Sequence, residues 1–236
     1  MTQINRETTA TAIVFGASGG IGSALTAALR RDPRYGEVLP FSRSGPHTFD
    51  LTDEHSIATA AAEVAAAGLT IRTVIDATGA LAAEGCVVEK SWRQIDPAAM
   101  ARAFQINAIG PALLMKHFLP LLAREGKSVF ATLSARVGSI GDNRLGGWYS
   151  YRASKAALNQ LVRTASVELR RTNPAALCVA LHPGTVATPF TQGFAKTGLQ
   201  VQTPDVAAGK LLAVIDGLDA SSNGTFLDQH GQPIDW

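Results

Sequence analysis

The feature that most constrains this chain is a short apolar run that ends in a glycine-rich turn. The run Ala12-Ile13-Val14-Phe15 leads into Gly16-Ala17-Ser18-Gly19-Gly20-Ile21-Gly22, and an alanine-rich helical pattern follows through Leu29. This order predicts a strand, a tight turn and a helix. The spaced glycines let the backbone approach a ligand, and the first amides of the helix favour an anion such as a pyrophosphate. We interpret the segment as a nucleotide-binding turn; an ordinary turn with glycines for packing is the alternative.

Apolar runs alternate with helical patterns along the rest of the chain. Strands are expected at 12–15, 37–41, 49–53, 72–80, 127–133, 176–181 and 224–227, and helices at 56–67, 97–123, 148–171 and 204–215. This alternation predicts an α/β fold, a doubly wound parallel sheet of about seven strands with helices on both faces. Because the 236 residues contain no repeat or linker, we expect a single domain over residues 1–236.

Composition disfavours several classes of partner. The formal net charge is +2 and no cluster of Lys and Arg exceeds two adjacent residues, so nucleic acid is not expected as a partner. Cys86 and Cys178 lack metal-type spacing, and we interpret them as free thiols in a reducing compartment, with no metal site. The polar first eleven residues do not resemble a signal peptide, and the apolar run 111–122 is too short for a bilayer. A cytoplasmic protein without a membrane partner is predicted.

Tyr151 and Lys155 stand four residues apart in a helical pattern, which places them on one face within side-chain reach. A free tyrosine hydroxyl has a pKa of ~10, too high for ready proton exchange at neutral pH. A nearby ammonium favours the phenolate and lowers that pKa. The pair is therefore a candidate for handing a proton to a carbonyl oxygen or taking one from an alcohol. With six lysines and three tyrosines in the chain, a chance occurrence is the alternative.

The end of the second strand indicates which dinucleotide is preferred. Ser42, Arg43 and Ser44 stand there without an acidic residue, and an arginine among small hydroxyl residues suits a ribose 2′-phosphate. NADP(H) is therefore favoured over NAD(H), with a plain surface arginine as the alternative. Asp50 is placed to accept from an adenine amino group, or else forms a turn.

Three other features concern the same edge of the predicted sheet. The turn Asp76-Ala77-Thr78-Gly79 follows a strand and should face the cofactor. Asn107 lies four residues before Pro111 within a helix, and the proline favours a kink near it. A buried Asn at this position either satisfies the hydrogen bonds of the kink or belongs to the site. The turn from His182 to Pro189 offers hydroxyl groups and free amides, and residues 190–202 stand where a mobile lid is expected.

With the glycine turn, Asn107, Ser134, Tyr151-x-x-x-Lys155 and Pro183-Gly184 in this order, the chain resembles the classical short-chain dehydrogenase/reductase family. The phrase from Gly146 to Lys155 is similar to that of the C-factor and sniffer-like branch. The resemblance implies a Rossmann-type fold and hydride transfer between a nicotinamide and a small carbonyl or alcohol substrate. It implies Tyr151 as general acid/base, Lys155 as the residue that binds the nicotinamide ribose and lowers the tyrosine pKa, and Asn107 as the residue that orders a water.

The resemblance also implies a set of cofactor contacts, which include Asn107, Tyr151 and Lys155. The others are Gly16, Ser18, Gly19, Gly20, Ile21, Gly22, Ser42, Arg43, Ser44, Asp50, Leu51, Ala77, Thr78, Gly79, Pro183, Gly184, Val186 and Thr188.

Three departures from the family pattern stand out. The family's Asn-Asn-Ala-Gly turn is Asp76-Ala77-Thr78-Gly79 here, and Phe15 replaces the usual threonine. Ala135 occupies the position, three residues before a glycine, where the catalytic serine commonly stands. A hydroxyl that binds the substrate oxygen is worth roughly 3 kcal/mol in comparable sites. We predict that Ser134 supplies it after a one-residue shift of the loop, with Ser139 second and neither residue as the third alternative.

Two function classes follow. The first is an NADP(H)-dependent carbonyl reductase or alcohol dehydrogenase for a small, moderately hydrophobic substrate. The second, suggested by Ala135 and the altered turn, is a cofactor-binding signalling or scaffold protein of the C-factor type with little turnover. A homodimer or homotetramer is expected from the resemblance, and the apolar and small positions of 156–169 fit a helix that packs across a two-fold axis. A helix buried in its own core is the alternative there.

Overall fold

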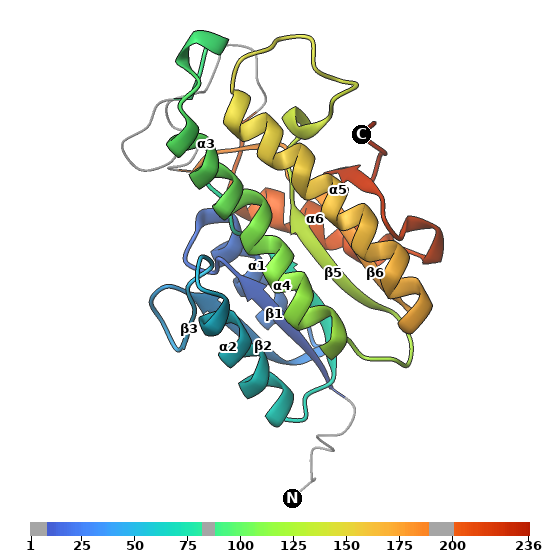
Figure 1. Ribbon diagram of the computed structural model, residues 1–236. Helices are drawn as coiled ribbons and strands as arrows, with labels where there is room; N and C mark the ends of the chain where they lie inside the picture. The colour runs from blue at the N-terminus through green and yellow to red at the C-terminus, as the bar shows by residue number, and fades with distance from the viewer. Residues whose placement is uncertain (1–8, 82–87, 189–200) are drawn as a thin grey trace, which may run out of the picture.

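The centre of the molecule is a wholly parallel sheet. The structure is a computed structural model that describes residues 9–81, 88–188 and 201–236. Its seven-stranded sheet has the order β3-β2-β1-β4-β5-β6-β9 (Figure 1). The strands are β1 Ala10–Phe15, β2 Tyr35–Ser42, β3 His47–Thr48, β4 Ile71–Asp76, β5 Ser128–Leu133, β6 Ala176–His182 and β9 Phe226–Asp228. The predicted doubly wound α/β fold is confirmed. Its direction of winding changes between β1 and β4, where such sheets bind ligands at their carboxyl edge.

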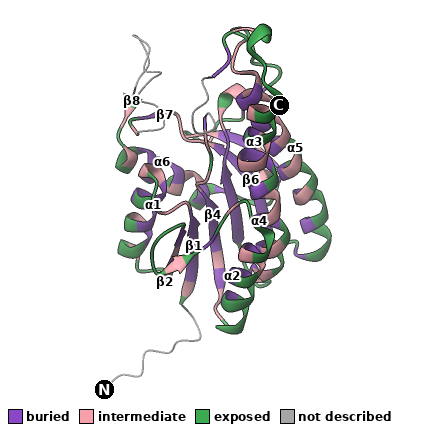
Figure 2. Ribbon diagram, turned by 60° about the vertical axis from the view of Figure 1, so that its left-hand side comes forward, coloured by how far each residue is buried: buried purple, intermediate pink, exposed green. Residues whose placement is uncertain are grey.

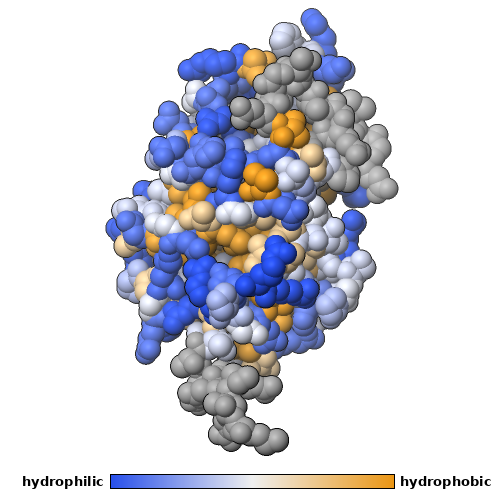
Figure 3. Space-filling model, turned by 180° about the vertical axis from the view of Figure 1, so that it is seen from behind, coloured by the Kyte–Doolittle hydropathy of each residue, from blue (hydrophilic) through white to orange (hydrophobic). Residues whose placement is uncertain are grey.

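Helices cover both faces of the sheet. One face carries α1 Gly20–Arg31 and α6 Pro204–Gly217, and the other carries α2 Glu54–Ala66, α4 Gly110–Phe118 and α5 Tyr149–Thr172. Helix α3 Pro97–Phe104 precedes α4 and packs against α5. Figure 2 shows the buried strands enclosed between these two layers of helices. Seen from behind, apolar side chains also gather across the middle of the surface, with hydrophilic ones around them (Figure 3).

Four phenylalanines fill the core beneath the first turn. The ring of Phe15 lies 5.1 Å from that of Phe41, 5.1 Å from that of Phe49 and 4.7 Å from that of Phe118. Edge-on and tilted contacts of this kind add to the free energy gained by burying the rings. Phe15 thus takes the place of the family's threonine because a hydrophobic neighbourhood from β2, α4 and the loop after β3 surrounds it.

The helix expected over 97–123 is interrupted. It consists of α3, a π-helical turn Gln105–Ile109, α4 and a 3-10 turn Leu119–Leu121. Pro111 has no backbone N–H to donate, and the widened turn accommodates that loss. A π-helical turn thus stands where the sequence predicts a kink, and Asn107 lies within it.

Other boundaries differ from expectation. Strand β3 precedes the expected start at Phe49, whose amide donates to Ser42 O at 3.1 Å while its ring enters the core. Asp53 caps α2, which begins at Glu54 and so before the expected residue 56, whereas Thr203 caps α6, which begins at the expected residue 204. Val201–Gln202 (β8) pairs with Thr185–Val186 (β7), a small second sheet that the sequence did not suggest. The lid expected at 190–202 lies mostly outside the described residues, as does Cys86. Within the described part of the chain, no helix combines the length and apolar character needed to cross a membrane.

Candidate active site

The glycine turn joins the carboxyl ends of three strands. Gly16 has φ +75°, and a Cβ there would lie 2.8 Å from the carbonyl oxygen of Ala77, so the turns after β1 and β4 are in direct contact. The amide of Ala17 donates to Phe41 O and that of Ala77 donates to Phe15 O, both at 3.0 Å. The predicted cofactor turns are thus assembled side by side at the point where the sheet changes its winding direction.

The beginning of α1 is open to an anion. Its N-cap residue, Gly19, provides no side-chain cap, and the first turn contains no acidic residue. Uncapped amides and the helix dipole favour a negative group at this end. Ser18 and Gly19 are exposed, whereas Ile21 packs toward the core. Thr188 lies against Gly20, where a Cβ would approach its methyl group to 2.7 Å. This arrangement fits the pyrophosphate of a dinucleotide.

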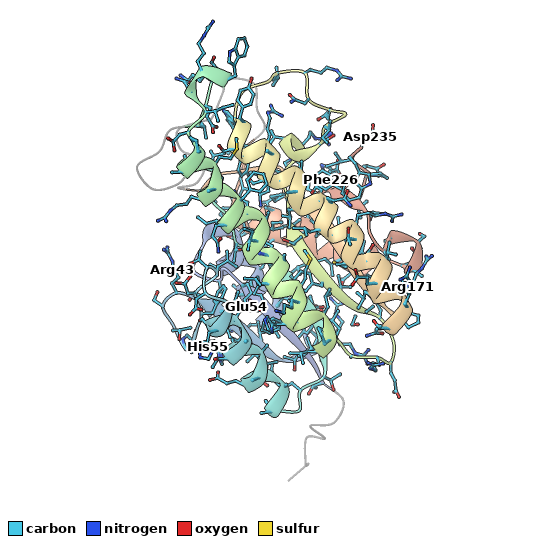
Figure 4. All side chains as sticks on the ribbon, in the orientation of Figure 1. Arg43, Glu54, His55, Arg171, Phe226 and Asp235 are labelled. Carbon is cyan, nitrogen blue, oxygen red and sulfur yellow. The ribbon has the colours of Figure 1, made fainter. Side chains whose placement is uncertain are left out.

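The end of β2 lies beside that turn. Ser42 is buried and its hydroxyl donates to the carbonyl oxygen of Ser44, while the Arg43 side chain is exposed on the loop before β3 (Figure 4). Asp50 Oδ1 accepts from the amide and hydroxyl of Thr52 at 2.8 and 2.7 Å. These two bonds, together with the charge of Arg43, lower the pKa of Asp50. Asp50 therefore has the hydrogen bonds of a turn former, and its neighbour Leu51 packs against Gly110.

Tyr151 and Lys155 are brought together on one buried face of α5. Their residues are 6% and 3% exposed, and Lys155 Nζ lies 6.0 Å from the centre of the Tyr151 ring. Lys155 Nζ donates to Leu133 O at 2.9 Å. Burial raises the pKa of the Tyr151 hydroxyl. Burial also lowers the pKa of Lys155 to about 8, against the opposing influence of the Asp76 carboxylate.

Asn107 connects the π-helical turn to the same region. Its Oδ1 accepts from Ala80 N at 2.9 Å and its Nδ2 donates to Ala80 O at 2.8 Å. The same Nδ2 lies 3.2 Å from Ser154 Oγ, which donates to the Tyr151 carbonyl oxygen. A Cβ on Gly79 would lie 3.2 Å from Asn107 Oδ1 and 3.4 Å from Lys155 Nζ, so these three residues converge. Asn107 fixes the loop after β4 beside the Tyr–Lys pair.

The serine that follows β5 has a structural partner. Ser134 is 4% exposed and its hydroxyl donates to Asn159 Oδ1 at 2.6 Å. Ser139 Oγ accepts from Asp142 N at 3.0 Å. Ala135, in contrast, packs in the apolar cluster around Tyr151 that also contains Leu81, Val88, Val137 and Trp148. A substrate contact by Ser134 stays a prediction, and Ala135, which packs against the cluster that contains Tyr151, carries only a methyl group.

The turn after β6 completes the edge. Gln202 Nε2 donates to Pro183 O at 2.6 Å and Val186 is buried, which ties the Pro183–Gly184 turn to the small β7–β8 sheet. Together with Thr188, this turn lies on the same side of the sheet as the glycine turn. A contact of this turn with the nicotinamide carboxamide stays a prediction.

Two acidic residues were not predicted to have a role of their own, although Asp76 begins the turn that was expected to face the cofactor. Asp76, fully buried at the end of β4, accepts from Thr78 and Thr132. Glu89, 6% exposed, accepts from the amide and hydroxyl of Ser150 and so holds the first turn of α5. The departure from the family's Asn at position 76 was the available signal for the first. No sequence pattern points to the second, because its partner is distant in the chain.

Comparison with known proteins identifies the family. A family model described as Enoyl-(Acyl carrier protein) reductase matches residues 20–210. The 1-hydroxy-2-glutathionyl-2-methyl-3-butene dehydrogenase of Rhodococcus sp. (strain AD45) is 33% identical over 195 residues, 74% of this chain and 84% of that protein. The chain belongs to the short-chain dehydrogenase/reductase family. At this level it is an oxidoreductase that uses a nicotinamide cofactor.

Two other relatives place the chain within the short-chain dehydrogenase/reductase family. The C-signal of Myxococcus xanthus is 40% identical over 142 residues, which cover 60% of this chain and 81% of that protein. The crystal structure of an NADPH-bound carbonyl reductase from chicken fatty liver has a TM-score of 0.83 and 29% identity, and the match covers 97% of this chain and 99% of that one. The resemblance to C-factor and carbonyl-reductase members is thereby confirmed.

Proposed function

We propose that the protein is an NADP(H)-dependent carbonyl reductase or alcohol dehydrogenase in which Tyr151 is the general acid/base. The observation that carries this proposal is the buried pair of Tyr151 and Lys155 at the carboxyl edge of the sheet. The bound nicotinamide supplies or accepts the hydride. In reduction, the Tyr151 hydroxyl gives a proton to the carbonyl oxygen as the hydride reaches the carbon, and in oxidation it takes that proton back.

Lys155 makes this proton exchange accessible. Burial alone favours the neutral phenol, which would leave Tyr151 a poor base. A positive charge on Lys155 stabilises the phenolate and lowers the tyrosine pKa toward the working range. Its bond to Leu133 O directs the ammonium group, and Asn107 holds the adjoining loop. We assign Lys155 also to the nicotinamide ribose, as the resemblance implies.

The preference for NADP(H) rests on Arg43. Its exposed guanidinium stands at the end of β2, next to Ser42 and Ser44, where a 2′-phosphate would lie. No acidic residue competes at these three positions. The chicken carbonyl reductase, of similar fold, is NADPH-bound.

The cluster around Tyr151 favours a small, moderately hydrophobic substrate. Leu81, Val88, Val137 and Trp148 supply its apolar surface. Since the Ser134 hydroxyl already donates a hydrogen bond to Asn159 Oδ1, Tyr151 is the principal donor to the substrate oxygen while that bond is in place.

Ala135 also supports a second candidate function, a cofactor-binding signalling protein of the C-signal type with little turnover. Without a hydroxyl at this position, the oxygen that develops charge has one donor fewer. A screen of aldehydes, ketones and alcohols followed by NADPH absorbance separates the two candidates, since robust turnover of a simple carbonyl excludes the second.

Assembly remains a prediction. Ile109 in the π-helical turn is 45% exposed, Val167 on α5 is 44% exposed and Val206 on α6 is 49% exposed. Such side chains are compatible with a homodimer or homotetramer. Sedimentation of the purified protein decides the oligomeric state.

The decisive test is Tyr151→Phe. The variant keeps the ring in its apolar cluster and loses only the hydroxyl, so NADPH binding should persist while turnover falls by at least about 10³-fold. Fluorescence titration of NADPH measures the first quantity and initial rates measure the second. Unchanged turnover in a variant that binds NADPH normally would refute the assignment of Tyr151.

A further inference from the structure

The carboxyl group at the end of β4 has no role in the chemistry described so far. Asp76 is fully buried. Its Oδ1 accepts from the amide of Thr78 at 3.0 Å and from the Thr78 hydroxyl at 2.5 Å, and its Oδ2 accepts from Thr132 Oγ1 at 2.6 Å. All three bonds are donated to the carboxyl oxygens, so the group is held in one orientation below the surface of the site.

This carboxylate lies at the end of the strand next to the one whose last residue binds Lys155. Asp76 is the register partner of Thr132 on β5, and the next residue, Leu133, provides the carbonyl oxygen that binds Lys155 Nζ. The carboxylate and the ammonium therefore lie at the ends of adjacent strands, and the charge of Asp76 acts on Lys155. Buried opposite charges of this kind interact strongly because little water screens them.

We propose that Asp76 is a positioning residue that keeps Lys155 protonated, and through Lys155 keeps Tyr151 reactive. The effect on Tyr151 rests on the proposed function, whereas the effect of Asp76 on the protonation of Lys155 does not. Lys155 is almost completely buried, and burial disfavours its charged form. A nearby anion offsets that penalty. The neutral Asn of the family's turn would not.

Other charged groups near Lys155 do not supply the same effect. Tyr151 shares its helix face, and the π-helical turn contributes the neutral Asn107. The turn Arg136–Gly138 packs on the Lys155 backbone, but the Arg136 guanidinium is positive and lies 3.8 Å from Asp142 and 3.7 Å from Asp228. Among the described residues, Asp76 is thus the acidic residue whose charge acts on the Lys155 ammonium.

Asp76→Asn tests this idea with little structural change. The amide oxygen can still accept from Thr78 and the amide nitrogen can donate to Thr132 Oγ1, so the charge is lost together with the one bond that Thr132 now donates. Thr132→Val is the matched control, because it removes one hydrogen bond of the same cluster and leaves the charge in place.

The measurement is the titration of lysine side chains by NMR in protein labelled with ¹³C at lysine Cε, with the Lys155 signal assigned from Lys155→Met. We expect Asp76→Asn to lower the titration midpoint of Lys155 by about one pH unit or more, and Thr132→Val to leave it within a few tenths. An unchanged midpoint in Asp76→Asn, or equal shifts in both variants, would overturn the proposal.

Kinetics give an independent readout of the same shift. In the carbonyl-reducing direction, the loss of turnover at alkaline pH should begin at a lower pH in Asp76→Asn, by the shift that NMR reports, while the Kd for NADPH stays within about threefold. If the wild-type protein reduces no carbonyl, the proposed function fails, and the lysine titration still decides the role of Asp76.

Discussion

Replacing Ala135 by serine should convert a weak reductase into a stronger one. Ala135 packs beside Tyr151 but is partly exposed, so an added hydroxyl is not trapped in an apolar interior. Its backbone is extended, with φ −145° and ψ 143°, at the N-cap position of the 3-10 turn Arg136–Gly138. Serine is favourable in that conformation and position. The fold should therefore accept Ala135→Ser without loss of stability.

The magnitude follows from the role of a second donor to the substrate oxygen. Removing one such donor in comparable sites costs about 2.7–4 kcal/mol, or about 10²–10³-fold in kcat. The new hydroxyl can also cap the 3-10 turn, and this competing bond reduces its availability to the substrate. We therefore expect Ala135→Ser to raise kcat by about 10- to 100-fold, with the Kd for NADPH unchanged.

The assay is NADPH consumption with a panel of small aldehydes and ketones, and Ser134→Ala is the companion variant. Ser134→Ala leaves Asn159 Oδ1 without its donor, in a side chain whose Nδ2 already has no partner among the described residues. It should lower the free energy of unfolding by about 1–3 kcal/mol and change kcat by less than about threefold. A loss of 100-fold in kcat at unchanged stability would instead identify Ser134 as the substrate donor. An Ala135→Ser protein that binds NADPH and gains no rate refutes the reasoning about position 135.

Three further outcomes are expected. Gly22→Ala should lower Tm and weaken NADPH binding at least about tenfold, because its Cβ would overlap the carbonyl oxygen of Gly16, whereas Gly209→Ala in α6, which meets nothing within 4 Å, should not. Arg43→Asp should weaken NADPH relative to NADH by about 10- to 100-fold in fluorescence titrations, and Arg171→Asp at the far end of α5 should leave the ratio unchanged (Figure 4). Because Lys155 has a folded pKa of about 8 against an ordinary 10.5, its burial penalty is fully present below pH 8 and is released as the pH rises toward 10.5. Chemical denaturation across this window should show a stability gain in wild type that Lys155→Met lacks.

The sequence predicts local features of this molecule and misses those that depend on the approach of distant segments. The glycine turn, the α/β alternation and the Tyr151–Lys155 spacing are each encoded within a few residues, and the sheet and the pairing follow from them. The bond from Ser134 to Asn159 joins β5 to the middle of α5, 25 residues apart. The spacing from Gly138 predicts that the serine lies on the loop. It does not reveal that the hydroxyl of Ser134 already donates a hydrogen bond to Asn159.

A Tyr-x-x-x-Lys pair does not by itself favour proton exchange once both side chains are buried. Burial moves the pKa of the tyrosine up and the pKa of the lysine down, so each change opposes the ionised pair on which proton exchange depends. The pair on α5 therefore depends on groups of the strands beneath it to keep Lys155 charged. Leu133 orients the ammonium and Asp76 opposes its deprotonation, and they lie at the carboxyl ends of the adjacent strands β5 and β4. The same edge that is suited to a dinucleotide thus also holds the charge that the proposed proton donor, Tyr151, needs.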